Sequence, residues 1–278
     1  MATNERMSSI KQTATLKGDK HMNVNSKTTI SERGELASTN RQTAIKESRM
    51  KITTPKVIRL AGLSAMLAGV CFLVIGMFHP VNVLSSVTSA TWVNVHIAAT
   101  ALGFFGLLGL AGLYTRQVEE TGWLGLAGFL LFGAWMALAG GMSLVEAFIL
   151  PRLTTEFPAY VTGIMGMFSS IPSQVDLGAL PTLWLIQGPL YILGPLLFGI
   201  ATFRARVLPR WAGALLVLGA ALIPVGAMVP PEWQPKIMLP VGLAMAWLGY
   251  ALFSERRAPA LAPAPCEESP QLIQPIAA

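Results

Sequence analysis

The chain has 278 residues, of which 53% are hydrophobic and only 12% are charged, and its net charge is +6. A soluble domain usually carries about 25% charged residues, so the composition indicates a membrane protein. Twelve of the 20 Lys and Arg side chains lie in residues 1–59, and residues 1–56 contain no Trp, Phe or Tyr. The positive charge therefore lacks the folded basic face with interleaved aromatics of a nucleic-acid-binding protein, and we expect no nucleic-acid partner.

Residues 1–56 predict a disordered basic tail, since they are rich in Ser, Thr, Asn, Lys and Glu and show no apolar periodicity. The first 50 residues contain no hydrophobic stretch of the secretory type, so membrane entry is expected to begin with the first long apolar segment. The stretch "MKITTPKVIRLAG" also resembles an ordinary basic flank before a first span. This raises the hypothesis that translation begins at Met50.

Six apolar segments follow, each near the length of about 20 residues that an α-helix needs to cross a bilayer. They are apolar at both odd and even positions, which favours helices over the alternating strands of a membrane barrel. We therefore predict an all-α membrane protein, with a six-helix transmembrane bundle in residues 57–253. The predicted spans are Val57–Phe78, Trp92–Tyr114, Gly122–Leu150, Leu177–Phe203, Arg210–Val229 and Ile237–Phe253.

The small residues of the second and third spans predict close helix packing. Glycines recur every third residue in "GFFGLLGLAG", and the third span adds Gly140-Gly141. Glycine allows helix backbones to approach closely in lipid, where packing rather than the hydrophobic effect holds helices together. Packing within the chain is the favoured interpretation, and a homo-oligomer or a membrane partner held through the same glycine-rich faces is the alternative.

The segment Pro151–Asp176 is the longest predicted connection, and the fourth span after it carries the pairs Gly188-Pro189 and Gly194-Pro195. Prolines are tolerated in membrane helices because neighbouring groups satisfy the freed carbonyls. The connection is apolar but too short and broken to span, so we expect a re-entrant or interfacial segment that caps the polar cluster at the outer end of the bundle. Packing against lipid headgroups is favoured over a lid on a ligand pocket.

Residues 254–278 are rich in Pro and Ala and predict a disordered tail. One cysteine, Cys266, lies in this tail and the other, Cys71, lies in the first span. We therefore expect no disulfide framework.

The orientation follows from the positive-inside rule. With the N-terminus in the cytoplasm, eighteen Lys and Arg side chains lie inside and only Arg152 and Lys236 lie outside. Tryptophans predict the two membrane interfaces, with Trp92 and Trp233 on the outer side and Trp123 and Trp211 on the inner side. Both termini are accordingly expected in the cytoplasm.

Polar side chains converge on one depth near the outer face. At 1.5 Å per residue, His96 and Glu146 each lie on the order of 6 Å inside their helix ends. Ionisable groups inside spans are costly and are functional candidates for that reason. The candidate ligand-binding residues are His79, Asn94, His96, Glu146 and Gln187.

Several interpretations of this cluster remain open. The favoured one is structural, with His79 reaching toward water and His96 and Glu146 forming a pair that fixes helix register. Functional alternatives are a proton- or cation-responsive pocket, a Zn²⁺ or other transition-metal site at His79, His96 and Glu146, and axial ligation of a haem by the two histidines. No short motif singles out a cofactor, which stays unknown.

The start "RLAGLSAMLAGVCFLVIGMFHP" and the six-span layout resemble uncharacterised bacterial multi-pass integral membrane proteins, a family defined only as a domain of unknown function. The resemblance covers residues 57–253 and implies a bacterial inner membrane, with no activity attached. We expect a binding or accessory protein with a small outward-facing polar pocket rather than an enzyme. The alternatives are a proton- or ion-coupled transporter of small solutes and a metal- or haem-dependent membrane enzyme.

Overall fold

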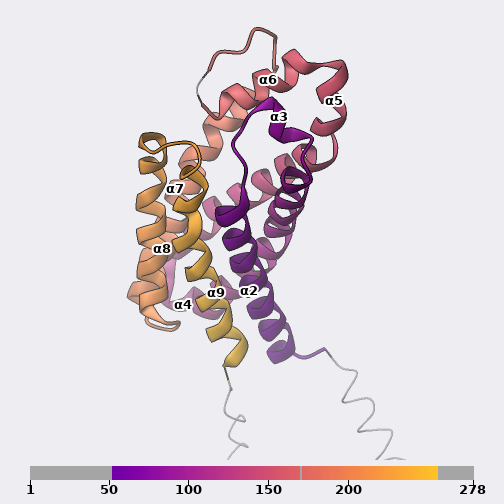
Figure 1. Cartoon of the computed structure of the whole chain (residues 1–278). Helices are drawn as coiled ribbons and strands as arrows, with labels where there is room; N and C mark the ends of the chain where they lie inside the picture. The colour runs from indigo at the N-terminus through magenta and orange to yellow at the C-terminus, as the bar shows by residue number, and fades with distance from the viewer. Residues whose placement is uncertain (1–51, 170, 256–278) are drawn as a thin grey trace, which may run out of the picture. The chain divides into compact units, whose positions relative to one another are not determined.

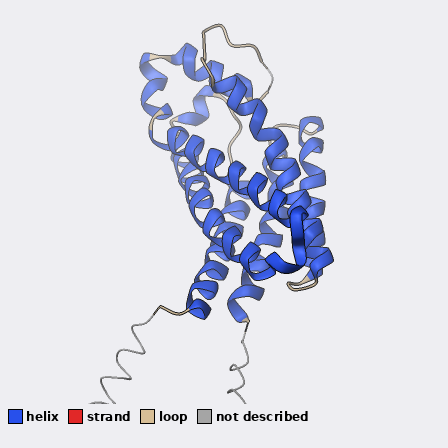
Figure 2. Cartoon of the chain, turned by 180° about the vertical axis from the view of Figure 1, so that it is seen from behind, coloured by secondary structure: helices blue, strands red, loops and turns tan. Residues whose placement is uncertain are grey.

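A computed structural model describes residues 52–169 and 171–255, and all regular elements in these ranges are helical (Figures 1 and 2). The described residues exclude two parts of the predicted tails, residues 1–51 and residues 256–278. Met50, the hypothetical start of translation, lies in the first of these parts. Five helical segments in the described part are long and apolar enough to cross a membrane. They are α2 (Thr54–Phe78), α4 (Ala90–Phe148), α7 (Leu180–Ala205), α8 with the 3-10 helix η1 (Arg210–Met228), and the 3-10 helix η2 with α9 (Gln234–Ser254).

Helix α4 covers the predicted second and third spans together, so the structure supplies five candidate helices where the sequence predicts six spans. Its 59 residues include two with non-helical backbone, Gln117 and Gly122. Gly122 has φ 55° and ψ −151°, a conformation that essentially only glycine adopts. The chain turns here, and we call residues 90–116 the first arm of α4 and residues 123–148 its second arm.

The two arms of α4 lie side by side. A Cβ atom added to Gly103 would lie 2.7 Å from the Cα atom of Gly140, which leaves room for hydrogen atoms only. One turn along, a Cβ atom on Gly106 would meet the sulfur of Met136 at 2.6 Å. The arms therefore run past each other at the closest distance that glycine permits.

The predicted fifth and sixth spans are shorter as α-helices than the sequence indicates. Helix α8 (Arg210–Leu222) gives way to η1 (Ile223–Met228), and η2 (Gln234–Met238) precedes α9 (Leu239–Ser254). Proline lacks a backbone N–H and clashes with the preceding turn. Pro224 and Pro240 stand at these junctions, which accounts for the change of helix type. In α7, by contrast, Pro189 and Pro195 lie inside one continuous helix, as predicted.

The long helices form a closed ring of contacts. Helix α2 packs against α9 and α4, α4 packs against α7, α7 against α8, and α8 against α9. The glycine stripe of the first arm faces this interior, since added Cβ atoms on Gly109 and Gly112 would overlap Ala65 and Ala61. Internal packing therefore occupies the face that the oligomer alternative requires.

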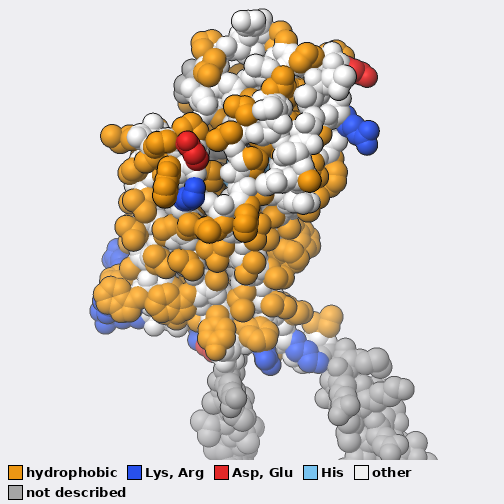
Figure 3. Space-filling model, in the orientation of Figure 1, with side chains coloured by type: hydrophobic (Ala, Val, Ile, Leu, Met, Phe, Trp, Pro, Cys, Tyr) orange, Lys and Arg blue, Asp and Glu red, His pale blue; other side chains and the backbone are white. Residues whose placement is uncertain are grey.

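Basic side chains gather at one end of the ring. At that end Arg59 lies over the ring of Phe253, and Arg116 donates hydrogen bonds to the carboxylate of Glu255. Gln117 donates to the hydroxyl of Thr202 at 2.9 Å, which brings the end of α7 to the turn of α4. Figure 3 shows Lys and Arg side chains at the lower end of the view and hydrophobic side chains over the helices above them, with further Lys and Arg side chains nearer the upper end.

Three of the four tryptophans predicted at the membrane interfaces are exposed. Trp123, Trp211 and Trp233 are 86%, 63% and 60% exposed, as residues of a membrane interface are in the isolated chain. Trp92 is fully buried, so its predicted place at the outer interface is wrong. Its indole makes its contacts inside the protein, with His96 and Glu146.

A small second core closes the end opposite the basic cluster. The predicted irregular segment Pro151–Asp176 forms two short helices, α5 (Leu150–Glu156) and α6 (Pro158–Met167), beside α3 (Leu84–Val87). Their apolar side chains pack together and onto Trp92; the buried members are Val87, Trp92, Leu150, Val161, Ile164, Met165 and Leu177. The segment is therefore a packed cap. Its buried apolar side chains contact one another and Trp92, and they do not all face outward as headgroup contacts would require.

Two adjacent glycines of the second arm offer a matched test of this packing. In Gly140→Ala the new methyl group would lie 2.9 Å from the Cα atom of Gly103, and the arms must separate to admit it. In Gly141→Ala the methyl group meets nothing within 4 Å. We expect Gly140→Ala to lower the free energy of unfolding by about 1–3 kcal/mol. Gly141→Ala should leave stability unchanged or raised, because alanine restricts the unfolded chain.

Thermal unfolding of both variants in the same detergent measures the difference. Equal stability of the two variants would contradict the close contact between the arms.

Candidate functional site

A cavity of about 670 Å³ opens between the helices near the capped end. Its walls come from the end of α2, both arms of α4, α7, and the segments around η1 and η2. The candidates His79, His96, Glu146 and Gln187 all line it. Four of the five predicted site residues, contributed by four separate stretches of chain, are therefore brought to one cavity.

Asn94 is the exception. Its side chain is exposed and does not line the cavity. An α-helix turns by 3.6 residues, so a position two residues before His96 points to nearly the opposite side. The prediction for Asn94 considered depth alone, and this local geometry excludes it.

His96 and Glu146 form a buried pair across the two arms of α4. The Nε2 atom of His96 lies 3.4 Å from the Oε2 atom of Glu146. The residues are only 3% and 7% exposed. The carboxyl group also contacts the hydroxyl of Ser143, one turn earlier on the same arm. The side chains meet because the arms cross in the register set by Gly103 and Gly140.

Trp92 holds this pair in place, a role that the sequence analysis missed. Its indole N–H donates to the backbone carbonyl of Glu146 at 2.9 Å, and its ring stands 4.2 Å from the ring of His96. The Ser89 hydroxyl accepts from the Trp92 backbone N–H at 3.1 Å and caps the start of α4. The four-residue spacing from Trp92 to His96 was the available signal, because it puts both rings on one helix face.

The hydrogen bonds of His96 define its tautomer. Its Nδ1 atom lies 2.8 Å from the carbonyl oxygen of Trp92, which can only accept, so Nδ1 carries a proton. Nε2 therefore faces Glu146 either with a proton toward a carboxylate or without one toward a carboxylic acid. In each of these two forms a single proton would lie between Nε2 of His96 and Oε2 of Glu146, whereas loss of that proton leaves the imidazole lone pair facing a carboxylate.

His79 has the same arrangement at the end of α2. Its Nδ1 atom donates to the carbonyl of Pro80 at 2.6 Å, and its ring centroid lies 5.1 Å from that of His96. Burial lowers the pKa of His79 below its usual range, and the hydrogen bond to Pro80 offsets only part of this effect. A neutral ring with its proton on Nδ1 has an Nε2 lone pair that can accept. His79 is half-buried and lines the cavity wall.

A column of aromatic rings forms a second part of the wall. Trp135 of α4 stacks on Phe72 of α2 at 5.8 Å and on Tyr191 of α7 at 4.1 Å. The Tyr191 hydroxyl is buried and has no hydrogen-bond partner among the described residues. These residues were not predicted for the site, because they lie on three helices and no spacing along the sequence relates them.

The side chains do not assemble a metal site within the described part of the chain. Residues 52–169 and 171–255 hold no group of three His, Cys, Asp or Glu side chains that could bind a metal ion. The Zn²⁺ set predicted at His79, His96 and Glu146 is therefore not formed.

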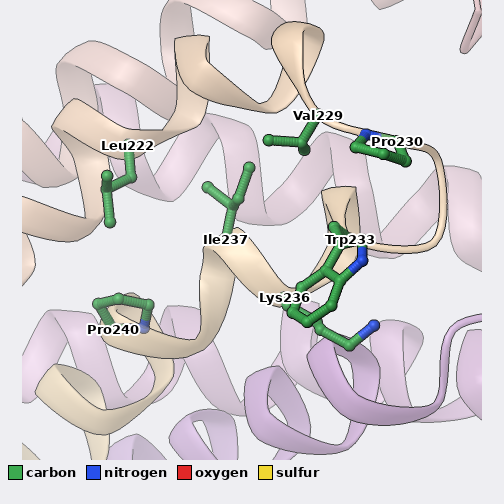
Figure 4. A pocket seen from close by; sticks show the side chains of 7 residues that line it. All are labelled: Leu222, Val229, Pro230, Trp233, Lys236, Ile237 and Pro240. Carbon is green, nitrogen blue, oxygen red and sulfur yellow. The ribbon is translucent and has the colours of Figure 1, made fainter.

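A second cavity, of about 510 Å³, lies between the end of α8 and the start of α9 (Figure 4). Its wall is apolar apart from Lys236, whose ammonium lies 4.7 Å from the ring centroid of Trp233. The lining residues are Leu222, Val229, Pro230, Trp233, Lys236, Ile237 and Pro240. This cavity lacks the converging polar groups of the first one.

Comparison with known proteins adds no assignment, since no protein-family model, curated protein or solved structure matches the chain. Functional inference therefore rests on the geometry of the larger cavity.

Substitution of Trp92 tests how the pair is held. Trp92→Phe removes the N–H that the Glu146 carbonyl accepts and leaves a void in the second core. We expect the free energy of unfolding to fall by about 2 kcal/mol or more. Trp233→Phe is the control, because Trp233 is 60% exposed. Chemical denaturation in detergent measures both variants, and an equal effect of the two would mean that Trp92 does not support the site.

Proposed function

We propose that the chain is a multi-pass protein of the cell membrane that crosses it six times, with both termini in the cytoplasm. Each arm of α4 exceeds the roughly 20 residues needed to span, and the arms run side by side. Short loops rich in Lys and Arg stay on the cytoplasmic side. The basic cluster around Arg59, Arg116 and the α7–α8 connection supports this orientation, and it puts the cavity toward the exterior.

The function that the geometry supports best is binding of a small ligand in the outward-facing cavity, as a binding or accessory membrane protein. The observation that carries this proposal is the cavity of about 670 Å³ with the His96–Glu146 pair in its wall. Ligand sites are typically concave and mostly apolar, about 300–1,000 Å³ in volume, with a few converging polar groups. Aromatic faces at Trp135 and Tyr191 and polar groups at His79 and Gln187 match that description.

Proton-coupled transport of the same ligand is the second candidate. It is favoured by the contact between His96 and Glu146, two side chains that can exchange a proton. A proton that leaves this pair when a ligand binds would couple ligand binding to proton movement. Uptake into proteoliposomes under an imposed pH gradient distinguishes this candidate from binding alone.

Two exposed glutamates at opposite ends of the second arm test the topology. Glu119 lies near the turn of α4 and Glu156 at the end of α5. With Cys71 and Cys266 replaced by serine, we expect Glu156→Cys to react with a membrane-impermeant maleimide in intact cells. Glu119→Cys should react only after permeabilisation. Labelling of both cysteines in intact cells would mean that the second arm does not span, and the reverse pattern would overturn the orientation.

Two adjacent residues of the same arm test the open cavity. Ser143 lines the cavity, whereas Leu144 is 46% exposed on the outer side of the bundle. In the same cysteine-free background, Ser143→Cys should react with a charged methanethiosulfonate added outside the cells. The reaction should be on the order of tenfold faster than at Leu144→Cys, because a thiol facing lipid does not ionise readily.

Equal, slow reaction at both positions would mean that water does not reach the cavity from the exterior. The proposed binding function would then lose its basis.

A further inference from the structure

The cavity carries groups that accept hydrogen bonds and negative charge, with no opposing cation among the described residues that line it. Glu146 lies inside it. Glu232, on the connection between η1 and η2, stands exposed at its edge, and the ammonium of Lys236 donates a hydrogen bond to its backbone carbonyl. The Nε2 lone pair of His79 adds an acceptor. Neither Lys nor Arg lines the cavity in residues 52–169 and 171–255, so its charge complements a cationic ligand.

The aromatic side chains of the same wall also favour a cation. The face of an aromatic ring carries partial negative charge, and cations bind over it most strongly when water is excluded. Trp135 and Tyr191 each have one face covered by the other at 4.1 Å, whereas Trp184, which lines the cavity beside Phe168, is 39% exposed. The buried hydroxyl of Tyr191 has no partner among the described residues, which leaves one polar group for a ligand to engage.

We propose that this cavity binds a small lipophilic ammonium ion, an aromatic amine in its protonated form, with the ammonium at Glu146 and the ring against Trp135 and Tyr191. The inference rests on the proposed ligand-binding function and names the chemical class of the ligand. An N–H-bearing ammonium fits better than a quaternary one, because the Glu146 carboxylate and the Nε2 atom of His79 both accept hydrogen bonds. The cavity volume of about 670 Å³ suits a ligand with one or two rings.

Binding of this cation displaces one proton. In the proposed resting state, the His96–Glu146 pair holds one proton and is neutral as a unit. The ammonium brings one positive charge and pairs with the ionised carboxylate of Glu146, so the shared proton leaves to the solvent. One proton is released for each cation bound. The only bond that breaks is the one that holds this proton, either the N–H bond of His96 or the O–H bond of Glu146.

The other titratable groups around the pair do not change this count. His79 comes from the end of α2, Tyr191 from α7 and Glu232 from the connection between η1 and η2. Burial lowers the pKa of His79, which favours its neutral form. Glu232 is exposed to solvent. The proton therefore comes from the pair on α4.

Calorimetric titration of the full chain in phosphatidylcholine nanodiscs tests the proposal, with 2-phenylethylammonium as the probe at pH 7. Empty nanodiscs provide the background. The neutral 2-phenylethanol and the anionic 3-phenylpropanoate have the same ring and differ in charge. Titration in phosphate and in Tris, whose ionisation heats differ, gives the number of protons released. We expect the ammonium to bind at least roughly tenfold tighter than either analogue, with one proton released per ligand.

Glu146→Gln keeps the shape of the side chain and removes its charge. We expect it to weaken ammonium binding by about thirtyfold or more and to abolish proton release. Glu156→Gln removes a carboxylate outside the cavity and should behave as the unsubstituted chain. The proton count in the unsubstituted chain tests the proposal independently, even if Glu146→Gln does not fold.

The proposal is overturned if either analogue binds as tightly as the ammonium, if the ammonium binds without releasing a proton, or if none of the three probes binds. In each case, the reaction of Ser143→Cys from the exterior distinguishes failure of the cationic-ligand proposal from failure of the proposed binding function. An accessible thiol would leave the outward-facing cavity standing and reject only the cationic ligand, whereas an inaccessible thiol would reject the cavity as a binding site.

Discussion

The contact between the two arms of α4 is the constraint on which the rest of the structure depends. Lipid offers no hydrogen-bond partner, so polar groups inside the bundle must be satisfied by one another. His96 and Glu146 lie on different arms, and they meet only because Gly103 and Gly140 allow the backbones to touch. The indole N–H of Trp92 then ties the arms together at the same level. Close packing and polar pairing are two consequences of one helix register.

Trp92 also connects the site to the cap that closes this end of the bundle. The indole ring of Trp92 contacts the ring of His96. The same side chain is fully buried in the second core with Val161 and Met165 of α6. Phe168, which follows α6 directly, lines the cavity. The short helices α5 and α6 are therefore part of the structure that shapes the site. A movement of the cap would displace Trp92, and through its indole ring it would shift the His96–Glu146 pair.

The two ends of the bundle have different chemistry. One end collects basic side chains, some of them held over aromatic rings, as Arg210 is over Phe203. The other end holds a cavity whose polar groups are carboxylates, imidazoles and amides. This separation supports both proposals at once, since the basic end suits the cytoplasmic face and the acceptor-lined cavity at the far end suits a cation from outside.

The sequence by itself determined the helical class, most helix positions along the chain and the depth of the polar side chains. A helix rises 1.5 Å per residue, so the shared depth of His96 and Glu146 follows from counting. The direction in which a side chain points depends on which neighbours its helix meets, and only the tertiary structure decided that. It buried Trp92 instead of leaving it at the interface, stacked Tyr191 on Trp135 from another helix, and joined the predicted second and third spans through the turn at Gly122. Local backbone geometry is encoded within a few residues, whereas these contacts join residues that are far apart in the chain.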